Sequence, residues 1–381
     1  MLNQELIDWL RLVLTPEIGS RRGKSLLEKF KTPKAILEAS LDDMAEVENV
    51  GREVAKKIVE GRKKIDLDLQ IKLIERNNVS LIPLDSEFYP SNLKSIYDPP
   101  LVLFLKGEIL PQDYFSIAIV GTRLASFYGR NMSEKLASQL VEKGFTIVSG
   151  GARGIDTFSH QTALRAKGRT IAVLGCGLDI TYPPDNKKLF EEIAQKGAMV
   201  SEFPLTTRPD KGNFPMRNRI ISGLSLGVVV IEAPHKSGAL ITVTHANEQG
   251  REVFSVPGQA DSFVSKGTNQ LLREGAKLVE NADDIIEELE PILKSKINEF
   301  KINHFEPVKK RQMPIMPELP ELTDEEAKLY SLLSSSSLDF DDIIVKSRLS
   351  VSAASSILMM LQLKKLVKQS PGKIFEKVNR S

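Results

Sequence analysis

Short apolar stretches alternate with amphipathic stretches through the middle of the chain. The amphipathic stretches carry apolar residues at helical spacing and predict helices near 127–142, 156–167, 186–196, 216–223 and 239–249. The apolar runs, rich in β-branched residues, predict strands and read "IAIV" (117–120), "TIVS" (146–149), "TIAVL" (170–174), "AMVS" (198–201), "VVVIE" (228–232) and "EVFSV" (252–256). Strands that alternate with helices predict an α/β core domain over 80–290, with a mostly parallel, doubly wound sheet covered on both faces.

The first part of the chain, residues 1–65, shows a helical pattern. Its segment "EVENVGREVAKKIVEG" places an apolar-glycine turn between two helical stretches, which is typical of a helix-hairpin-helix or SAM-like domain. The helix N-terminus in such a hairpin can bind a phosphate, although these hairpins also serve as packing units. The segment "GSRRGKS" (19–25) looks like a P-loop, but three residues separate its glycines where a P-loop has four, and a helix precedes it. A P-loop is therefore excluded.

After the core, the pattern predicts a linker and a third domain. Prolines recur through 291–320, which indicates an extended Pro-rich linker. Residues 321–381 show three helical stretches and a hairpin, the order of a winged-helix domain. The usual reading helix, 351–365, has serines in its early turns and no cation before Lys364. Because DNA backbones are bound by cations, contact with protein or plain packing is favoured over DNA binding there.

The composition is that of an ordinary globular protein. The formal net charge is only +2 over 381 residues, so any site for a polyanion must come from local clustering of cations. The single cysteine, Cys176, rules out an internal disulfide and fits a reducing, cytoplasmic setting. Flanked by glycines, it is interpreted as a small buried thiol and not as a nucleophile. The sequence predicts neither a signal peptide nor a membrane span.

Glycine, arginine, hydroxyl and lysine residues gather in the loops that follow the predicted strands. The carboxyl ends of parallel strands share one edge of the sheet, where ligands bind in open α/β folds. Glycine loops and helix N-termini expose amide groups to anions, and arginines pair with phosphate oxygens. We therefore predict a phosphate-binding site at this edge. The candidates are Gly121, Thr122, Arg123, Ser149, Gly150, Gly151, Arg153, Gly154, Phe214, Arg217, Asn218, Arg219, Lys236, Ser237 and Gly238.

Other uses of this edge fit less well. A dinucleotide cofactor is disfavoured because "SGGARGID" lacks the G-x-G-x-x-G spacing and no acid ends the next strand. No metal site is predicted, since the four histidines are scattered. His160 is interpreted as a buried or supporting residue in preference to a catalytic base. Glu202 and Glu232 could be acid–base groups, or could hold the arginines by ion pairs. Phe214 could lie in the core or stack on a base.

The core and the segment before it carry an ordered set of motifs. The "YPSNLKSIYDPPLVLFLKG" segment (89–107) precedes the sheet. The motifs that follow read "AIVGTRLASFYG", "SGGARGIDTFSHQTAL", "TIAVLGCGLDITYPPDN", "SEFP", "FPMRNRIISGLS", "SGALIT" and "GREVFSVPG". Over about 85–280, this ordered set resembles the DNA processing protein A (DprA/Smf) family, and "GTR" stands where the family often has GSR, which keeps the hydroxyl.

This resemblance implies an extended Rossmann-like core that binds single-stranded DNA, protects incoming strands and loads the RecA recombinase onto them in natural transformation. It implies a homodimer formed through the late part of the core, roughly 258–275, with no catalytic activity and no cofactor. It places the DNA pocket on Arg123, the "SGGARG" glycines and the "FPMRNR" residues, with "KSG" (236–238) as weaker candidates. One alternative is a Rossmann-like enzyme that hydrolyses nucleoside monophosphates. Its Pro-Gly-Gly-x-Gly-Thr loop is absent, and "PGQADSFVSKGT" is the nearest approach.

Overall fold

The computed structural model describes most of the chain. It covers residues 2–303, with side chains as far as Lys294, and then residues 329, 332–333, 338–347, 349, 353–354, 357–358, 361, 366–370 and 374–377. Two compact units, Met1–Asn298 and Glu299–Ser381, are described separately below.

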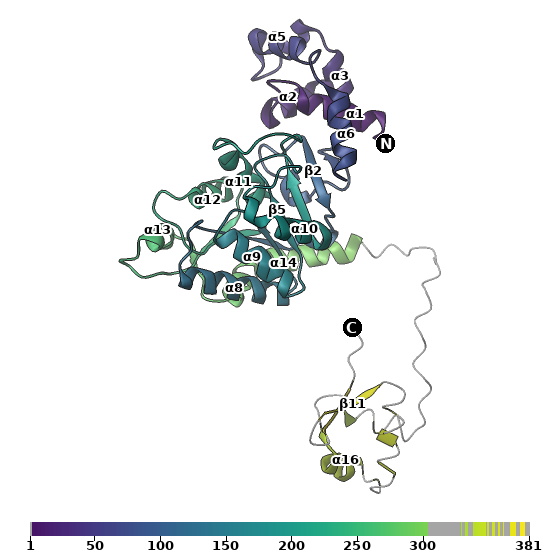
Figure 1. Ribbon diagram of the computed structural model, residues 1–381, viewed down its shortest axis with the longest axis vertical. Helices are drawn as coiled ribbons and strands as arrows, with labels where there is room; N and C mark the ends of the chain where they lie inside the picture. The colour runs from purple at the N-terminus through teal and green to yellow at the C-terminus, as the bar shows by residue number, and fades with distance from the viewer. Residues whose placement is uncertain are drawn as a thin grey trace. The chain divides into compact units, whose positions relative to one another are not determined.

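A nine-stranded sheet lies at the centre of the first unit (Figure 1). Its strand order is β1-β2-β6-β5-β4-β3-β7-β8-β9, and the seven strands from β6 to β9 in this order pair in parallel. β2 and β1 extend the β6 edge in antiparallel pairing. The bounds are β1 Ser80–Pro83, β2 Val102–Gly107, β3 Ser116–Val120, β4 Thr146–Ser149, β5 Thr170–Val173, β6 Ala198–Ser201, β7 Gly227–Val230, β8 Glu252–Ser255 and β9 Lys277–Leu278.

The predicted strands are confirmed as β3 to β8, with each end within two residues of the prediction. The chain builds the sheet outward from β3, with β4, β5 and β6 on one side and β7, β8 and β9 on the other. The winding therefore reverses between β3 and β7. In doubly wound sheets, the carboxyl ends of the strands at such a reversal leave a crevice that binds ligands.

Helices cover both faces of the sheet, as the alternating side chains of β3 show. Ile117 and Ile119 pack with α8, α9 and α14, whereas Ala118 and Val120 pack with α11 and α12. The bounds are α7 Ser91–Lys94, α8 Phe127–Glu142, α9 Ile155–Arg165, α10 Lys187–Lys196, α11 Asn213–Leu224, α12 Gly238–Glu248, α13 Lys266–Arg273 and α14 Ala282–Asn303. Within the described residues, no helix is both long enough and apolar enough to cross a membrane.

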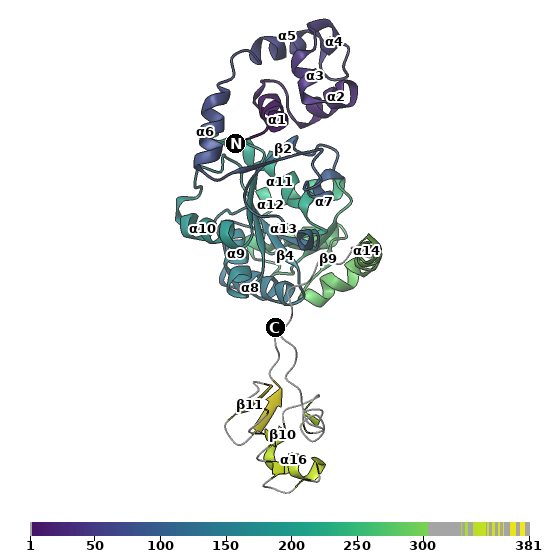
Figure 2. The same cartoon turned by 90° about the vertical axis from the view of Figure 1, so that its right-hand side faces the viewer.

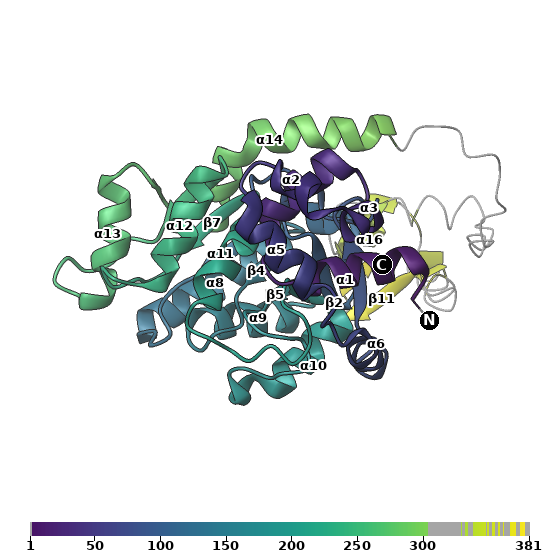
Figure 3. The ribbon, with the colours of Figure 1, turned by 90° about the horizontal axis from the view of Figure 1, so that it is seen from above.

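The N-terminal helices pack against the β1–β2 end of the sheet (Figure 2). Trp9 and Leu10 belong to one buried cluster with Leu101 and Phe104 of the core. In the view from above, these helices lie in front of the sheet (Figure 3). The "GSRRGKS" segment runs from the N-cap into α2, after α1, so the exclusion of a P-loop is confirmed. The bounds are α1 Gln4–Leu14, α2 Ser20–Phe30, α3 Pro33–Glu38, α4 Leu41–Ala45, α5 Gly51–Gly61 and α6 Leu67–Arg76.

Two stretches differ from the prediction. α11 begins at Asn213, so "NFPMRNR" is helical from its first residue. Pro215 is tolerated there because amide groups in a first helical turn have no acceptor within the helix. The extended linker expected from 291 is instead helix as far as Asn303, since α14 continues through Pro291. Leu289 of this helix is buried against the sheet cluster, which favours helix over an extended chain. The rest of the predicted linker lies outside the described residues.

The second unit contains a small antiparallel sheet and a helix. The sheet order is β10-β12-β11, with β10 Leu338–Asp339, β11 Val367–Ser370 and β12 Ile374–Lys377, and α16 spans Phe340–Ser347. Much of the predicted 351–365 helix lies outside the described residues. The fold is a Rossmann-like doubly wound sheet flanked by a helical N-terminal domain and a C-terminal winged-helix domain.

Candidate functional site

A cavity opens at the reversal point of the sheet, between the loops that follow β3 and β7. Its volume is about 520 Å³, and the first turns of α11 and α12 form its sides. It therefore lies at the edge where the sequence predicted a site. Eight of the fifteen candidates line it: Gly121, Thr122, Arg123, Phe214, Arg217, Asn218, Ser237 and Gly238.

An aromatic pair stands on one side of the cavity. The ring centroids of Tyr182 and Phe214 are 5.6 Å apart, with the rings tilted by 33°. A Cβ atom added at Gly175 would lie 2.9 Å from Cδ1 of Phe214, so the ring rests directly on glycine backbone. The exposed Arg123 places its Cζ atom 5.4 Å from the centroid of Phe214. An accessible cation thus lies beside the aromatic surface that Tyr182 and the half-buried Phe214 form.

Arg217 lies under the cavity wall and is only 4% exposed. Its Nη1 atom donates to the carbonyl of Gly150 at 2.6 Å and to the carbonyl of Val173. Burial lowers the pKa of Arg217 to about 10, although the nearby Asp156 raises it. The side chain therefore stays charged at neutral pH. Its Cζ atom lies 6.0 Å from the ring centroid of Phe214, so it supports this ring from within the protein.

The glycine loop after β4 binds a carboxylate of the protein itself. The amide of Ala152 donates to Oδ2 of Asp156 at 3.2 Å, and the amide of Gly150 also donates to this carboxylate. Burial raises the pKa of Asp156, and Arg217 opposes that shift. Asp156 thus takes amide groups that were expected to face a phosphate.

The other loop residues contact the protein itself, and Ser149, Gly150, Gly151 and Gly154 do not line this cavity. Ser149 is buried and donates to the carbonyl of Ile119 at 2.7 Å. A Cβ atom at Gly150 would lie 2.7 Å from Nη1 of Arg217, and Gly151 packs on Phe190. Gly154, with φ at +77°, packs on the backbone of the "GTR" loop. Gly154 thus lets its loop approach the backbone of Arg123 closely, while Gly150 makes room for Arg217.

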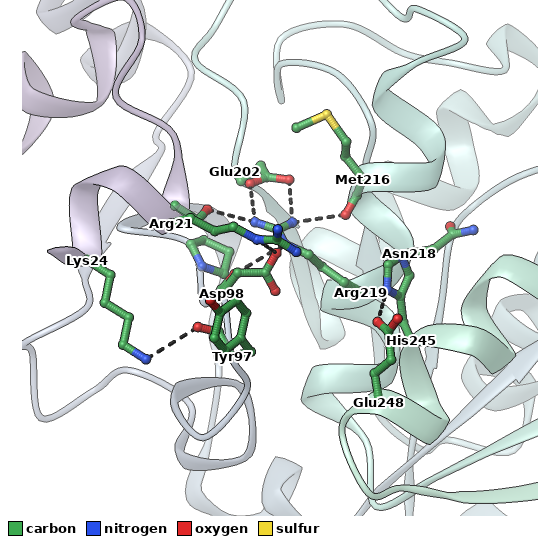
Figure 4. Close-up of polar contacts among 12 residues, drawn as sticks. Arg21, Lys24, Tyr97, Asp98, Glu202, Met216, Asn218, Arg219, His245 and Glu248 are labelled. Carbon is green, nitrogen blue, oxygen red and sulfur yellow. Dashed lines mark hydrogen bonds and ion pairs between the residues drawn. The ribbon is translucent and has the colours of Figure 1, made fainter. Parts of the chain in front are cut away.

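Arg219 does not line the cavity, and its guanidinium lies beside Glu202 and Asp98 (Figure 4). Its Nη1 and Nη2 atoms each lie 2.6 Å from an oxygen of Glu202, and its Nε atom lies 3.4 Å from Oδ2 of Asp98. Nη2 also donates to Oγ of Ser20, in α2, at 2.8 Å. Burial lowers the pKa of Arg219, but Glu202 and Asp98 raise it above its ordinary value. Arg219 joins the helical domain to the core.

Of the other candidates, Asn218 lines the cavity, Lys236 lies beside it and Arg153 lies outside it. Nδ2 of Asn218 donates to the carbonyl of Gly238 at 3.1 Å, which joins α11 to the start of α12. Lys236 is exposed beside the lining residue Ser237. Arg153 does not line the cavity, and its Nη2 atom pairs with Oδ2 of Asp185 at 2.7 Å with both side chains largely exposed.

Lys211 and Tyr182 are two of the lining residues that the sequence argument missed. Lys211 is exposed in the turn before α11, and Tyr182 follows β5 in the "TYPPDN" segment. Lys211 could have been found from its position two residues before "NFPMRNR", as one more cation at the same edge. The pairing of Tyr182 with Phe214 could not have been found from the sequence, because it joins segments that are distant along the chain.

The other titratable residues are structural. Glu232 accepts from the amide and the hydroxyl of Ser126, at the start of α8, so it does not hold an arginine as had been considered. His160 is fully buried, and burial lowers its pKa to about 3, which makes it neutral. Burial raises the pKa of the Cys176 thiol to about 11. Among the described residues, no group of three His, Cys, Asp or Glu side chains could hold a metal ion.

Comparison with known families agrees with this architecture. Residues 80–290 match the family model described as DNA recombination-mediator protein A. The chain belongs to this family. Residues 313–373 match the DprA winged helix domain, and residues 11–64 match a SAM-like helix-hairpin-helix tandem.

Relatives extend the similarity over the whole chain. The chain is 34% identical to Protein Smf of Synechocystis, over 99% of this chain and 100% of that protein. It is 48% identical to the DNA processing protein DprA of Bacillus subtilis, over 55% of this chain and 71% of that protein.

A solved structure is also similar. The chain resembles DprA of Streptococcus pneumoniae with a TM-score of 0.65 and 36% identity, over 74% of this chain and 97% of that one. A second solved structure, DprA of Helicobacter pylori, matches with a TM-score of 0.51 and 34% identity, over 56% of this chain and 96% of that one. That structure concerns the single-stranded DNA binding mode of the Helicobacter pylori protein.

Proposed function

We propose that the cavity binds single-stranded DNA. The observation that carries this proposal is the half-buried Phe214 ring with the exposed Arg123 guanidinium 5.4 Å from its centroid. Bases stack on aromatic side chains while cations bind the phosphates, and this combination is typical of sites for single strands. Lys211 at the same cavity supplies another exposed cation. The single-strand binding named for the Helicobacter pylori relative supports this assignment.

The charged and aromatic residues at the cavity take different parts in the proposed complex. Arg123 and Lys211 bind phosphate oxygens, and Phe214 and Tyr182 offer their faces to bases. Arg217 holds the Phe214 ring from below and adds to the positive potential. Asp156 accepts the loop amides, which favours recognition of the strand by side chains over recognition of phosphate by a glycine loop. Lys236 at the rim extends the cationic path.

The wider role follows from family membership. We propose that the protein protects incoming single strands and passes them to the RecA recombinase in natural transformation, as a cytoplasmic homodimer without catalytic activity. The proposed dimer surface is the 258–275 region, which includes the exposed Phe263. The rival activity, hydrolysis of nucleoside monophosphates, would release free base from AMP, and we expect no such release. Both carboxylate oxygens of Glu232 accept hydrogen bonds from Ser126, which disfavours an acid–base role for this residue.

The test is the affinity of variants for fluorescent oligo(dT), measured by anisotropy over a range of salt concentrations. We expect Arg123→Ala to weaken binding by on the order of tenfold, because it removes a phosphate contact and the cation beside Phe214. The salt dependence of log K should fall in slope by about 0.7, the value of one phosphate contact on a single strand. The matched control is Arg165→Ala. This exposed arginine lies at the C-terminal end of α9, away from the cavity, so the variant should bind normally. Undiminished affinity of Arg123→Ala would contradict the assignment.

A further inference from the structure

An exposed aromatic side chain lies between two cations beside the helical domain. Tyr97, just after α7, is 72% exposed. The Cζ atom of Arg21 lies 5.3 Å from its ring centroid, and the Nζ atom of Lys24 lies 5.8 Å from it (Figure 4). Lys24 also donates to the carbonyl of Tyr97 at 3.3 Å. Two cation–ring contacts and one hydrogen bond to its carbonyl thus hold Tyr97 at the surface.

The helix α2 aims both cations at this ring. Arg21 and Lys24 are three residues apart, so they share one face of the helix. Gly23 between them is buried and would bring any Cβ atom onto the side chain of Leu101. This close contact seats α2 on the core and fixes the direction of its cationic face. The "GSRRGKS" segment, excluded as a P-loop, therefore presents cations from a helix surface.

The cluster keeps a surplus of positive charge. Asp98 is shared, with its Oδ2 atom 3.7 Å from Nε of Arg21 and 3.4 Å from Nε of Arg219. Glu202 is held by Arg219 alone in this cluster, through both oxygens. The carboxylates thus mainly neutralise the buried Arg219. The Arg21 side chain remains 70% exposed, so its charge is accessible to a ligand.

The cluster adjoins the proposed DNA cavity across the N-terminal end of α11. Phe214 and Pro215 line the cavity, and the next residue, Met216, is 53% exposed. The Met216 carbonyl accepts from Arg219 at 2.9 Å, and Arg219 in turn contacts Ser20 of α2. The exposed Met216 thus lies between the cavity and the α2 surface.

We propose that Tyr97, Arg21 and Lys24 form a second contact for single-stranded DNA, in which a base stacks on Tyr97 and the two cations bind neighbouring phosphates. This inference rests on the proposed function of the cavity, whose strand it extends onto the helical domain. The ligand is a single strand, because the exposed aromatic face matches an unpaired base and the flanking cations match its phosphates.

The first test makes Tyr97 the reporter. The only tryptophan, Trp9, is buried, so Tyr97→Trp adds one exposed fluorophore. We expect saturating oligo(dT) to quench the added fluorescence, with a midpoint equal to that of binding followed by anisotropy. The control is Leu278→Trp, at an exposed position of β9 on the opposite edge of the sheet, which should not be quenched. Unchanged fluorescence of Tyr97→Trp at saturation overturns the proposal.

The second test separates this contact from the cavity by oligonucleotide length. Tyr97→Ala should bind short oligo(dT) as the parent does, and should bind long oligo(dT) on the order of tenfold more weakly. Tyr97→Phe, which keeps the ring, should restore the affinity. Arg123→Ala, in the cavity, should weaken binding at every length. Loss of affinity in Arg123→Ala with none in Tyr97→Ala at any length refutes only the second contact. The reverse result refutes the cavity and leaves Tyr97 as a DNA contact.

Discussion

Arg217 and Arg219 leave the same helix two residues apart and enter opposite environments. Arg217 points to the cavity wall, where its partners are two backbone carbonyls and the Phe214 ring. Arg219 points to the helical domain, where its partners are two carboxylates and a hydroxyl. Two residues turn an α-helix by about 200°, which separates the two side chains onto nearly opposite faces.

The difference in partners is reflected in the pKa of each guanidinium. Burial lowers the pKa of Arg217 to about 10, although the nearby Asp156 raises it, and its backbone carbonyl partners carry no full negative charge. Glu202 and Asp98 overcome burial at Arg219 and raise its pKa. The two buried cations at this sheet edge therefore have different roles. Arg217 supports the Phe214 ring behind a ligand surface, while Arg219 joins two domains through its ion pairs.

The largest effect is expected from Arg219→Ala. This change leaves Glu202 buried without its partner, and breaking a buried ion pair costs about 3–5 kcal/mol. The free energy of unfolding should be measured by urea denaturation, with Trp9 fluorescence as the signal. Replacing Glu202 and Arg219 together by methionine should restore most of the loss, because no buried charge is then left unpaired. A loss below about 1 kcal/mol in Arg219→Ala would show that the pair does not join the domains.

An intermediate effect is expected from Arg217→Met. It keeps most of the side-chain volume but leaves the carbonyls of Gly150 and Val173 without a donor, which costs about 2–3 kcal/mol. Because Phe214 loses its support, oligo(dT) affinity should also fall by on the order of tenfold. Urea denaturation and anisotropy on the same sample separate the two effects. Lost stability with unchanged affinity would make Arg217 a purely structural residue, like Arg219.

Much of the fold could be predicted from the sequence, because local patterns carry it. The β-branched runs gave each strand from β3 to β8, and the loops after them gave the edge that holds the cavity. The reversal between β3 and β7 could not be predicted from periodicity, since strand order depends on pairing between distant segments. The second contact at Tyr97 depends on the same kind of information, as it joins α2 to the segment before β2.

The candidates that do not line the cavity share one cause. The residues of "FPMRNR" were all expected to line one pocket at the edge. Because Arg217 and Arg219 are two residues apart in a helix, their side chains leave it on nearly opposite faces. In the same way, the glycines after β4 suggested free amide groups, but Asp156 in the following helix accepts them. A sequence shows which groups a loop offers, and only the folded chain shows which of them its own residues already bind.

The smallest effect is expected from Arg153→Ala, which tests how far the cationic edge extends. Arg153 lies in the glycine loop, but it pairs with Asp185 outside the cavity, and both side chains are more than 60% exposed. Exposed pairs contribute little, so the free energy of unfolding should change by less than about 0.5 kcal/mol. Oligo(dT) affinity should fall by less than about twofold, because salt screens a charge that contacts no phosphate. A loss as large as that of Arg123→Ala would place the strand across this loop as well. Lining the cavity would then no longer separate the arginines that bind DNA from those that do not.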